Sequence, residues 1–457
     1  MRDSGRDSLY PYVEEAVKGA PCPHSSHRHA QRMMMKKTRK DDYMKRKVFS
    51  AVTALIMAAT LANAQDFDQY FTDRTLRIDY TFAGNQQQQF IAVDQCSTSP
   101  RWYGKRKRLA ELPMEGNGQI TVRDHKSQQV IYRNSFSTLF QEWLTYPEAQ
   151  NGTKSFENVF LVPMPRDTVD VTIDLRNNRR EVMATLTHQV VPTDILIRRI
   201  GEKEVTPYET LLAAKDTTRC IHIAFMAEGY QEHEMDTFIR DAQEAIDALF
   251  AHEPFKSYKD RFHIVAVKSP SAESGTSTPS KGVWKNTALH SHFDTFYSNR
   301  YLTTLHLKDL HDWLAGTPYE HIIVLVNTSE YGGGGILNSY NLSMTHHRLY
   351  RPVVVHEFGH SFAGLADEYA YQEEEINMYP HDVEPWEQNI TTKADFKGKW
   401  SNLIGKDKKA GFYEGAGYSQ KGVYRAYPDC RMRTNENPIF CPACQQAIIG
   451  IIDFYTR

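Results

Sequence analysis

The chain has 457 residues, which is enough for two or three domains. Its hydrophobic content of 40% is ordinary for a soluble protein, and no low-complexity segment dominates it, which argues against a fibrous or largely disordered chain. The formal charge of −2 gives no basic excess of the kind that nucleic-acid binding requires.

Residues 44–64 have the pattern of a secretory signal peptide. A basic start at 44–47 is followed by a short apolar stretch at 48–61 and by an A-x-A cleavage site at 62–64. The apolar stretch is too short for a comfortable membrane span, and no other stretch is long and apolar enough. Position 65 is Gln rather than Cys, which argues against a lipid anchor. The pattern predicts a protein without a membrane span that is secreted, periplasmic or on the cell surface.

Residues 1–43 precede this signal and are interpreted as a disordered leader or a mispredicted start. Residues 1–64 contain twelve Lys or Arg and six Asp or Glu, so the rest of the chain has 42 basic and 50 acidic residues. Its formal charge of −8 again argues against a nucleic-acid partner.

Residues 65–200 are expected to form an all-β, sandwich-like N-terminal domain. Residues 76–82 alternate apolar and polar side chains, as a half-buried strand does. Short strands separated by turn signals are typical of an antiparallel sandwich. Similar strands are expected at 119–122, 130–132, 156–162, 169–175 and 182–191.

A linker at 201–218 is expected to lead into a catalytic domain at 219–457. There, short apolar strands alternate with stretches of helical spacing, which predicts an α/β (α+β) domain with a central sheet. The expected strands are 220–226, 262–267 and 322–326, and the expected helices are 232–252 and 299–314.

The motif His356-Glu357-Phe358-Gly359-His360 has the arrangement H-E-x-x-H. On a helix, residues four apart lie on the same face, so His356 and His360 can direct two imidazoles at one metal ion. Glu357 can then reach a water on that metal and act as general base. An amphipathic helix with two surface histidines is the simpler alternative.

A third ligand is expected just beyond this helix, since a catalytic zinc usually has three protein ligands. Gly364 offers a place for the helix to end, and Asp367 follows it by three residues, as the third ligand follows the glycine of the metzincin pattern. The glycine comes one residue later than in that pattern. Glu368 and Tyr369 are therefore neighbouring alternatives to Asp367.

Three cysteines lie together near the C-terminus, at positions 430, 441 and 444. In an oxidising compartment, Cys430 could form a disulfide with Cys441 or Cys444. A structural zinc is a second interpretation, but three cysteines lack an obvious fourth ligand. A reduced C-x-x-C at a helix start is the third.

Three stretches resemble the bacterial IgA-peptidase family of zinc metalloendopeptidases. They are HEFGHSFAGLADEY at 356–369, EYGGGGILNSY at 330–340 and CRMRTNENPIFCPAC at 430–444. The resemblance implies a β-rich N-terminal domain followed by a zincin-like, metzincin-like peptidase domain. It also implies a protein or glycoprotein substrate, of which immunoglobulin A is one example, although substrate does not transfer with fold.

The metzincin likeness implies two further features. Residues 336–343, entered through the flexible glycine run 332–335, would form an edge strand above the cleft, to which an extended peptide can add. Met432 would be the methionine that metzincins place beneath the metal. The substrate-binding residues expected on the edge strand are Ile336, Asn338 and Tyr340.

Together these features predict a secreted zinc metalloendopeptidase with one catalytic Zn²⁺. His356, His360 and Asp367 would hold the ion, and Glu357 would act as general base on a zinc-activated water. The alternative is an exported glycan- or protein-binding module with an inactive protease domain. The sequence leaves the oligomeric state open.

We predict that export removes the chain up to Ala64, because the basic, apolar and A-x-A regions occur in that order. N-terminal sequencing of the secreted protein should begin at Gln65. A mature protein that retains Met44 would contradict the predicted compartment.

Overall fold

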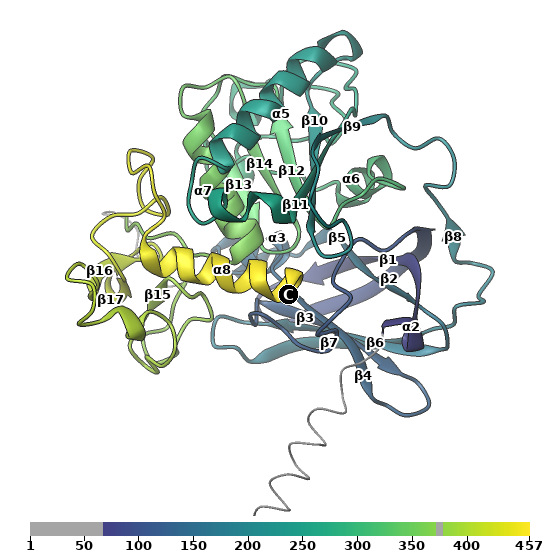
Figure 1. Ribbon diagram of the computed structural model, residues 1–457, viewed down its shortest axis with the longest axis horizontal. Coiled ribbons are helices and arrows are strands. Elements are labelled where there is room, and N and C mark those ends of the chain that lie inside the picture. Colours follow the sequence, from purple (N-terminus) through teal and green to yellow (C-terminus); the bar gives the residue numbers. More distant parts are fainter. Residues whose placement is uncertain (1–66, 372–377) are drawn as a thin grey trace, which may run out of the picture. The chain divides into compact units, whose positions relative to one another are not determined.

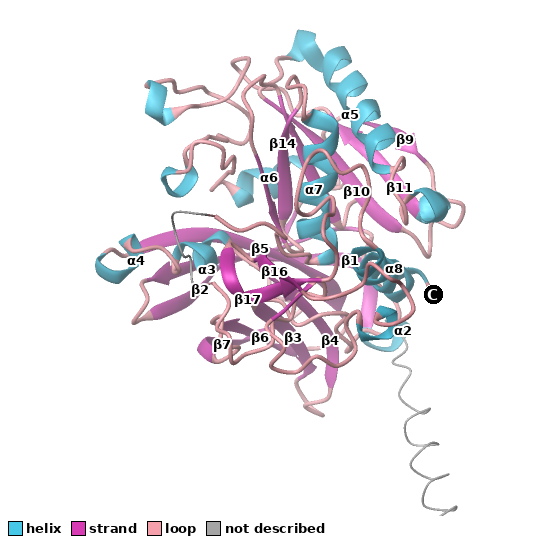
Figure 2. Cartoon of the chain, turned by 90° about the vertical axis from the view of Figure 1, so that its left-hand side faces the viewer, coloured by secondary structure: helices cyan, strands magenta, loops and turns pink. Residues whose placement is uncertain are grey.

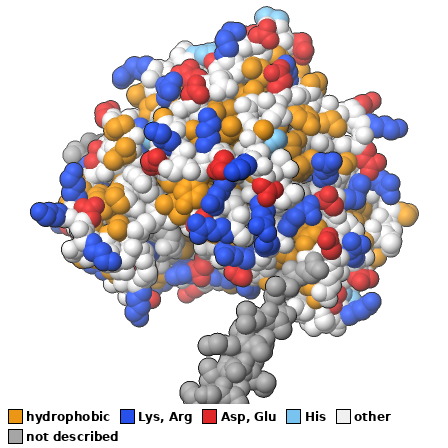
Figure 3. Space-filling model, in the orientation of Figure 1, with side chains coloured by type: hydrophobic (Ala, Val, Ile, Leu, Met, Phe, Trp, Pro, Cys, Tyr) orange, Lys and Arg blue, Asp and Glu red, His pale blue; other side chains and the backbone are white. Residues whose placement is uncertain are grey.

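The computed structural model describes residues 67–371 and 378–457. The predicted leader (1–43) and signal peptide (44–64) lie outside these residues. Within the described ranges, no helix is long and apolar enough to cross a membrane. On the face drawn in Figure 3, acidic and basic side chains are interspersed with hydrophobic ones.

The N-terminal part consists mainly of two four-stranded sheets, with strand orders β5-β1-β2-β8 and β4-β3-β6-β7 (Figure 1). The first five strands are β1 (Phe71–Gly84), β2 (Gln89–Pro100), β3 (Gly118–Asp124), β4 (Val130–Phe136) and β5 (Lys154–Pro165). They are followed by β6 (Val169–Arg176), β7 (Val182–Val190) and β8 (Arg198–Arg199). Three short helices accompany them: α2 (Phe67–Tyr70), α3 (Leu139–Trp143) and α4 (Glu148–Asn151).

Aromatic side chains join these two sheets. The ring of Phe136 on β4 lies 6.4 Å from that of Phe82 on β1 and 4.3 Å from that of Phe160 on β5. The Tyr80 hydroxyl on β1 lies 2.6 Å from Nε2 of His188 on β7. The alternation in the sequence therefore directs one face of each sheet toward the other, as the sequence predicted.

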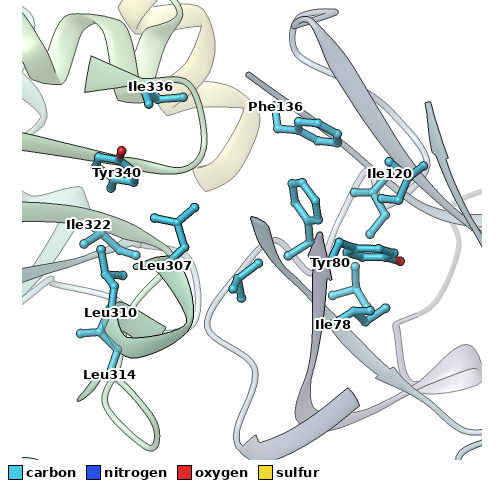
Figure 4. Packing of buried hydrophobic residues seen from close by; sticks show 14 of the residues in the cluster. Ile78, Tyr80, Ile120, Phe136, Leu307, Leu310, Leu314, Ile322, Ile336 and Tyr340 are labelled. Carbon is cyan, nitrogen blue, oxygen red and sulfur yellow. The ribbon is translucent and has the colours of Figure 1, made fainter. Parts of the chain in front are cut away.

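The second face of β1 is also buried, which the sequence pattern did not indicate. Arg77 and Asp79 lie on this face, only 2% and 1% exposed, and form an ion pair at 2.6 Å. Arg77 also donates to Asp312 at 2.5 Å and to the carbonyl of Lys308 at 3.2 Å, both on α6 (Leu307–Trp313). Helix α6 therefore covers the polar face of β1, and the hydrophobic cluster extends across this junction (Figure 4).

The C-terminal part is built on a six-stranded mixed sheet with the order β13-β14-β12-β10-β11-β9 (Figure 2). Its strands are β9 (Tyr208–Leu212), β10 (Ile221–Glu228), β11 (Phe262–Val267), β12 (His321–Val326), β13 (Gly333–Ile336) and β14 (Tyr340–Met344). Three longer helices belong to this part: α5 (Met235–Leu249), α7 (Tyr350–Ala363) and α8 (Pro442–Thr456). The four inner strands are parallel to one another, whereas β9 and β13 run antiparallel at the two edges.

The two faces of this sheet belong to different hydrophobic clusters. Ile221, Ile223 and Phe225 of β10 pack with residues of α5, α7 and α8. Ala224 and Met226 of the same strand pack with residues of α6 and of the N-terminal sheets. Because both faces are covered, β10 and β12 are fully buried, which explains why their sequences are apolar except at His222, Glu228 and His321.

Two segments differ from the sequence prediction. The helix expected at 299–314 is confined to α6, because the backbone before it pairs with other segments. Arg300 and Leu302 bond to Gly333, and Thr303 bonds to His292. The segment between Tyr369 and Asp429 has only weak periodicity, which predicts loops, yet it includes a small sheet with the order β15-β17-β16. Its strands are β15 (Ile390–Thr391), β16 (Tyr413–Ala416) and β17 (Ser419–Arg425).

The chain thus has a mixed α/β fold with a β-rich N-terminal part, as the sequence predicted. The boundaries 65–200, 201–218 and 219–457 stay a prediction, because one hydrophobic cluster runs through both parts.

Arg77→Ala should strongly destabilise the protein, because it leaves the carboxylate of Asp79 buried without its cation. Loss of one partner from a buried ion pair typically costs about 3–5 kcal/mol. Arg74→Ala is the matched control on the same strand, since the ion pair of Arg74 with Glu202 is solvent-exposed and its loss should cost at most about 1 kcal/mol. Denaturant unfolding of both variants measures the difference. Equal effects would contradict the structural role of Arg77.

Candidate active site

Helix α7 carries the H-E-x-x-H motif and ends where the sequence predicted. Gly364 adopts a left-handed conformation, with φ of 56°, and its N–H donates to the carbonyl of His360 at 3.0 Å. A glycine suits this position because it has no side chain to clash in the left-handed region. The chain then leaves the helix axis and brings residue 367 back toward the two histidines.

Both motif histidines are held by backbone carbonyls. Nδ1 of His356 lies 3.0 Å from the carbonyl oxygen of Arg431, and Nδ1 of His360 lies 2.5 Å from that of Leu365. A carbonyl can only accept, so each Nδ1 carries the hydrogen. In a neutral imidazole this leaves the Nε2 lone pair free, and the two Nε2 atoms lie 3.0 Å apart. This is the tautomer and orientation that a metal ion requires.

Asp367 completes this group. Its Oδ1 lies 3.0 Å from Nε2 of His356 and 3.3 Å from Nε2 of His360. The side chain is 6% exposed, and its other oxygen accepts a hydrogen bond from the Tyr418 hydroxyl at 2.5 Å. Once both histidines donate from Nδ1, Oδ1 has no donor among the described residues. Three electron-pair donors therefore meet at one point, an arrangement that fits a metal ion.

The pKa values in this group follow from burial and from the mutual charges. Burial raises the pKa of Glu357, and His356 and His360 only partly offset the increase. Burial lowers the pKa of His360, but Asp367 outweighs it and raises that pKa to about 9. Burial alone would raise the pKa of Asp367, yet His360 and His356 hold it well below its usual range. Asp367 therefore stays ionised, and without a metal ion a proton on His360 balances its charge, in the place that a metal ion would take.

The glycine run packs directly against the motif helix. A Cβ added at Gly333 would lie 2.8 Å from Oε1 of Glu357, and one added at Gly335 would lie 2.4 Å from the carbonyl oxygen of Glu357. Side chains at these positions would separate β13 from α7. The glycines therefore allow the close approach that places Glu357 beside the strand.

The edge strand begins earlier than the sequence predicted. The glycine run, expected as a flexible entry, forms most of β13, and β14 lies one position further into the sheet. Only Ile336 of the three expected residues is on the edge strand. Asn338 lies in the hairpin turn with φ of 51°, and Tyr340 is buried on β14 with its hydroxyl on the carbonyl of Thr304. The expectation was wrong here because the hairpin reverses the chain between residues 336 and 340.

Part of the β13 edge is already paired. The N–H and C=O of Gly333 bond to the backbone of Arg300 and Leu302, each at 3.3 Å. Since outward-facing groups alternate along a strand, the next outward-facing residue is Gly335.

Met432 lies beneath the motif helix. It is fully buried, and a Cβ added at Gly359, between the two histidines, would lie 2.7 Å from its sulfur. The same turn contributes the Arg431 carbonyl that orients His356, and the Met432 carbonyl accepts the N–H of Glu368 at 2.8 Å. The turn thus supports the helix and the segment that follows it.

The two alternatives to Asp367 lie elsewhere. Glu368 points away from the histidines and lies 3.1 Å from the sulfur of Cys444. Tyr369 lines the cleft beside Arg300, whose guanidinium is 5.8 Å from its ring. Among these three candidates for the third ligand, only Asp367 groups with the two histidines in the described part of the chain.

A cleft of about 540 Å³ opens over this group and has walls from both parts of the chain. Three residues in it were missed by the sequence analysis: Glu142 on α3, Arg300 and Tyr418. Burial raises the pKa of Glu142 to about 7, although a hydrogen bond from Tyr301 opposes the increase. No local pattern marks these residues, because each reaches the cleft only through the tertiary fold.

Comparison with models of known protein families identifies the family to which the chain belongs. The model of IgA Peptidase M64 matches residues 210–409 and 405–452, which is more than half of the chain. The model described as Peptidase M64 N-terminus matches residues 66–187. The chain belongs to the IgA peptidase M64 family.

Membership of the M64 family indicates a metallopeptidase that acts on protein, as the sequence predicted. No curated protein matches the chain. Among solved structures, the metalloproteinase-II of Bacteroides fragilis is 12% identical and covers 54% of this chain and 83% of its own, with a TM-score of 0.20. That similarity is too slight to inform the fold of this M64 chain.

Gly335→Ala should impair both stability and peptidase activity, because the added methyl group meets the backbone of Glu357 and has to displace β13 or α7. We expect a cost of about 1–3 kcal/mol in unfolding free energy and a fall in activity of roughly 10- to 100-fold from the displaced base.

Gly450→Ala on α8 is the matched control, since a Cβ there meets nothing within 4 Å. It should be neutral or slightly stabilising, because alanine favours a helix more than glycine does. Thermal unfolding and peptide cleavage measured on both variants check this. Full activity of Gly335→Ala would show that the contact between β13 and Glu357 is not required.

Proposed function

We propose that this chain is an exported, zinc-dependent metalloendopeptidase with a zincin-like catalytic domain. The observation that carries the proposal is the convergence of Nε2 of His356, Nε2 of His360 and Oδ1 of Asp367 beside Glu357 in an open cleft. Two histidines and one carboxylate leave a fourth position for water or substrate, which is typical of a catalytic rather than a structural zinc site.

His356, His360 and Asp367 would hold the ion. A zinc ion bound there would lower the pKa of its water toward ~7 and polarise the scissile carbonyl. The carbonyls of Arg431 and Leu365 keep the two imidazoles in the ligand tautomer, and Tyr418 fixes the second oxygen of Asp367. The negative charge of Asp367 would make the zinc a somewhat weaker Lewis acid than three neutral histidines would.

Glu357 is the proposed general base. It takes a proton from the attacking water and later delivers it to the leaving amine. Burial raises its pKa, which makes its carboxylate a better proton acceptor than an exposed glutamate. The absence of a side chain at Gly333 supports this role, because a Cβ there would lie 2.8 Å from Oε1, so the carboxylate lies beside the strand along which a substrate would bind.

An extended peptide would bind along β13. With Gly333 already paired, the outward-facing backbone groups of Gly335 are the ones available for an added strand. Ile336 lines the cleft at the end of the same strand, and Met432 would serve as the methionine beneath the metal. Arg300 and Tyr369 are the candidates for stabilising the oxyanion, because both line the cleft. Host glycoproteins such as immunoglobulin A are candidate substrates.

The alternative of a binding module with an inactive protease domain receives less support. A protein that only binds has no use for the half-buried carboxylate of Glu357 beside three metal-ligand atoms, since partial removal of its charge from water costs free energy. Cleavage-site profiling on a diverse peptide library, with protein stripped of metal and then restored with zinc, separates the two functions. Peptide cleavage that depends on restored zinc supports the peptidase, and no cleavage with zinc bound supports the module.

Glu357→Ala should abolish peptide hydrolysis while the metal stays bound, because Glu357 is the base and not a ligand. General-base loss typically reduces the rate by on the order of 10²–10⁴. Asp367→Ala is the contrasting variant and should lose metal as well as activity. Zinc content after dialysis and cleavage rate are measured on both. Wild-type activity in Glu357→Ala would show that another group is the base.

A further inference from the structure

A second group of metal-ligand side chains lies behind the first. Glu368, Cys430, Cys441 and Cys444 are all buried, and one ligand atom of each lies within 4.8 Å of the others. All three cysteines are free. The sequence offered three thiols without a fourth ligand, and the fold supplies that ligand as Glu368.

The spacing of the sulfur atoms favours a metal ion over a disulfide. Sγ of Cys430 and Sγ of Cys444 lie 3.7 Å apart. A disulfide joins its sulfurs at about 2.05 Å. A tetrahedral zinc with metal–sulfur bonds of about 2.3 Å separates its ligand sulfurs by about 3.8 Å. The observed separation corresponds to the tetrahedral arrangement.

Glu368 provides independent evidence. The residue is fully buried, and its Oε2 has no hydrogen-bond partner in the described part of the chain. Its Oε1 lies 3.1 Å from Sγ of Cys444 and accepts from the amide of Asn389 at 3.0 Å. A buried carboxylate oxygen without a partner is strongly unfavourable, and a cation at the centre of the group would satisfy it.

The surrounding backbone favours thiolates. The N–H of Cys441 donates to Sγ of Cys430 at 3.1 Å. Cys441 caps α8 and Cys444 lies in its first turn, where the helix dipole stabilises negative charge. These contacts would stabilise the sulfurs as metal-bound thiolates, the form that zinc binding requires.

We propose that Glu368, Cys430, Cys441 and Cys444 form a second, structural metal site that holds one zinc ion. Four protein ligands close the tetrahedron, so this zinc has no open position for water and takes no part in the chemistry. Full burial protects the thiolates from oxidation in an oxidising compartment.

This site would tie together the segments that support the active site. Glu368 directly follows Asp367, and its N–H donates to the Met432 carbonyl. Cys430 begins the turn that carries Arg431 and Met432. Cys444 belongs to α8, so a single ion would connect the C-terminal helix, the methionine turn and the segment of the third ligand.

Metal analysis of the protein purified without chelators tests the proposal. Wild type should contain two zinc ions per chain, and the double variant His356→Ala/His360→Ala should retain one. Cys444→Ser should lose the second zinc only. Cys96→Ser is the matched control: Cys96 is a free, half-buried cysteine on β2, outside both groups, and its variant should keep both ions.

The outcomes separate this proposal from the peptidase proposal. One zinc in wild type and none in the double histidine variant would overturn the second site and leave the peptidase proposal intact. One zinc in both would support the second site and overturn the first. An intact mass lowered by the two hydrogen atoms lost in a disulfide, with two thiols fewer on titration, would overturn the proposal.

Cobalt substitution keeps the test valid if the cysteine variants fail to fold. The double histidine variant reconstituted with Co²⁺ should show thiolate-to-cobalt charge-transfer absorption, because its remaining site has three sulfur ligands. The first site contains no sulfur and cannot produce this band. Its absence from the folded, cobalt-treated variant would overturn the proposal.

Discussion

The requirement for a cation beside helix α7 is the constraint on which the site depends. Two imidazole Nε2 atoms and a carboxylate oxygen converge, so a proton or a metal ion has to lie between them. Buried acceptors that face one another without a proton or a cation are strongly unfavourable. The surrounding contacts nevertheless hold them in place, through the carbonyls of Arg431 and Leu365 and the hydroxyl of Tyr418. The fold therefore holds these three groups in a cation-binding geometry, although their mutual electrostatic interaction is unfavourable without a cation.

A second constraint acts on the sheet edge. Three consecutive glycines, 333–335, form most of β13 and contribute no side chains to its packing. Glycine in a strand interior costs roughly 0.5–1 kcal/mol per residue in conformational entropy relative to alanine. The glycines allow β13 to lie close to α7, because a Cβ at Gly333 or Gly335 would lie less than 3.0 Å from an atom of Glu357. The position of Glu357 relative to the edge strand follows from that contact. The glycine run thus permits close packing and does not act as a flexible segment. Its interpretation as a flexible entry was wrong for this reason.

The features that the sequence predicted correctly depend on short-range spacing. The i, i+4 histidines, the helix end at Gly364 and the alternation in β1 each follow from residues close together in the chain. The sequence could not predict contacts that join distant residues: Tyr418 reaches Asp367 across 51 positions, and Glu368 reaches Cys444 across 76. Tyr301 reaches Glu142 across 159 positions. Such pairs depend on how the sheets pack, which no local pattern encodes. The edge strand was misplaced for a related reason, because a tight hairpin exchanges its edge and inner strands.

Asp367 and Glu368 show how closely the two metal-ligand groups are coupled. They are consecutive residues after the end of α7, yet one side chain lies against the motif histidines and the other against the cysteines. Between them, the backbone is held by the bond from the Glu368 N–H to Met432, whose side chain lies under Gly359. A shift of Glu368 would therefore also move Asp367, since a single peptide unit joins them. It would disturb the helix as well, because Met432 contacts both Glu368 and the helix. A rigid group of four ligands behind this peptide would limit that movement. Asp367 lies on a non-helical segment, so it needs such a restraint in order to stay within bonding distance of a metal.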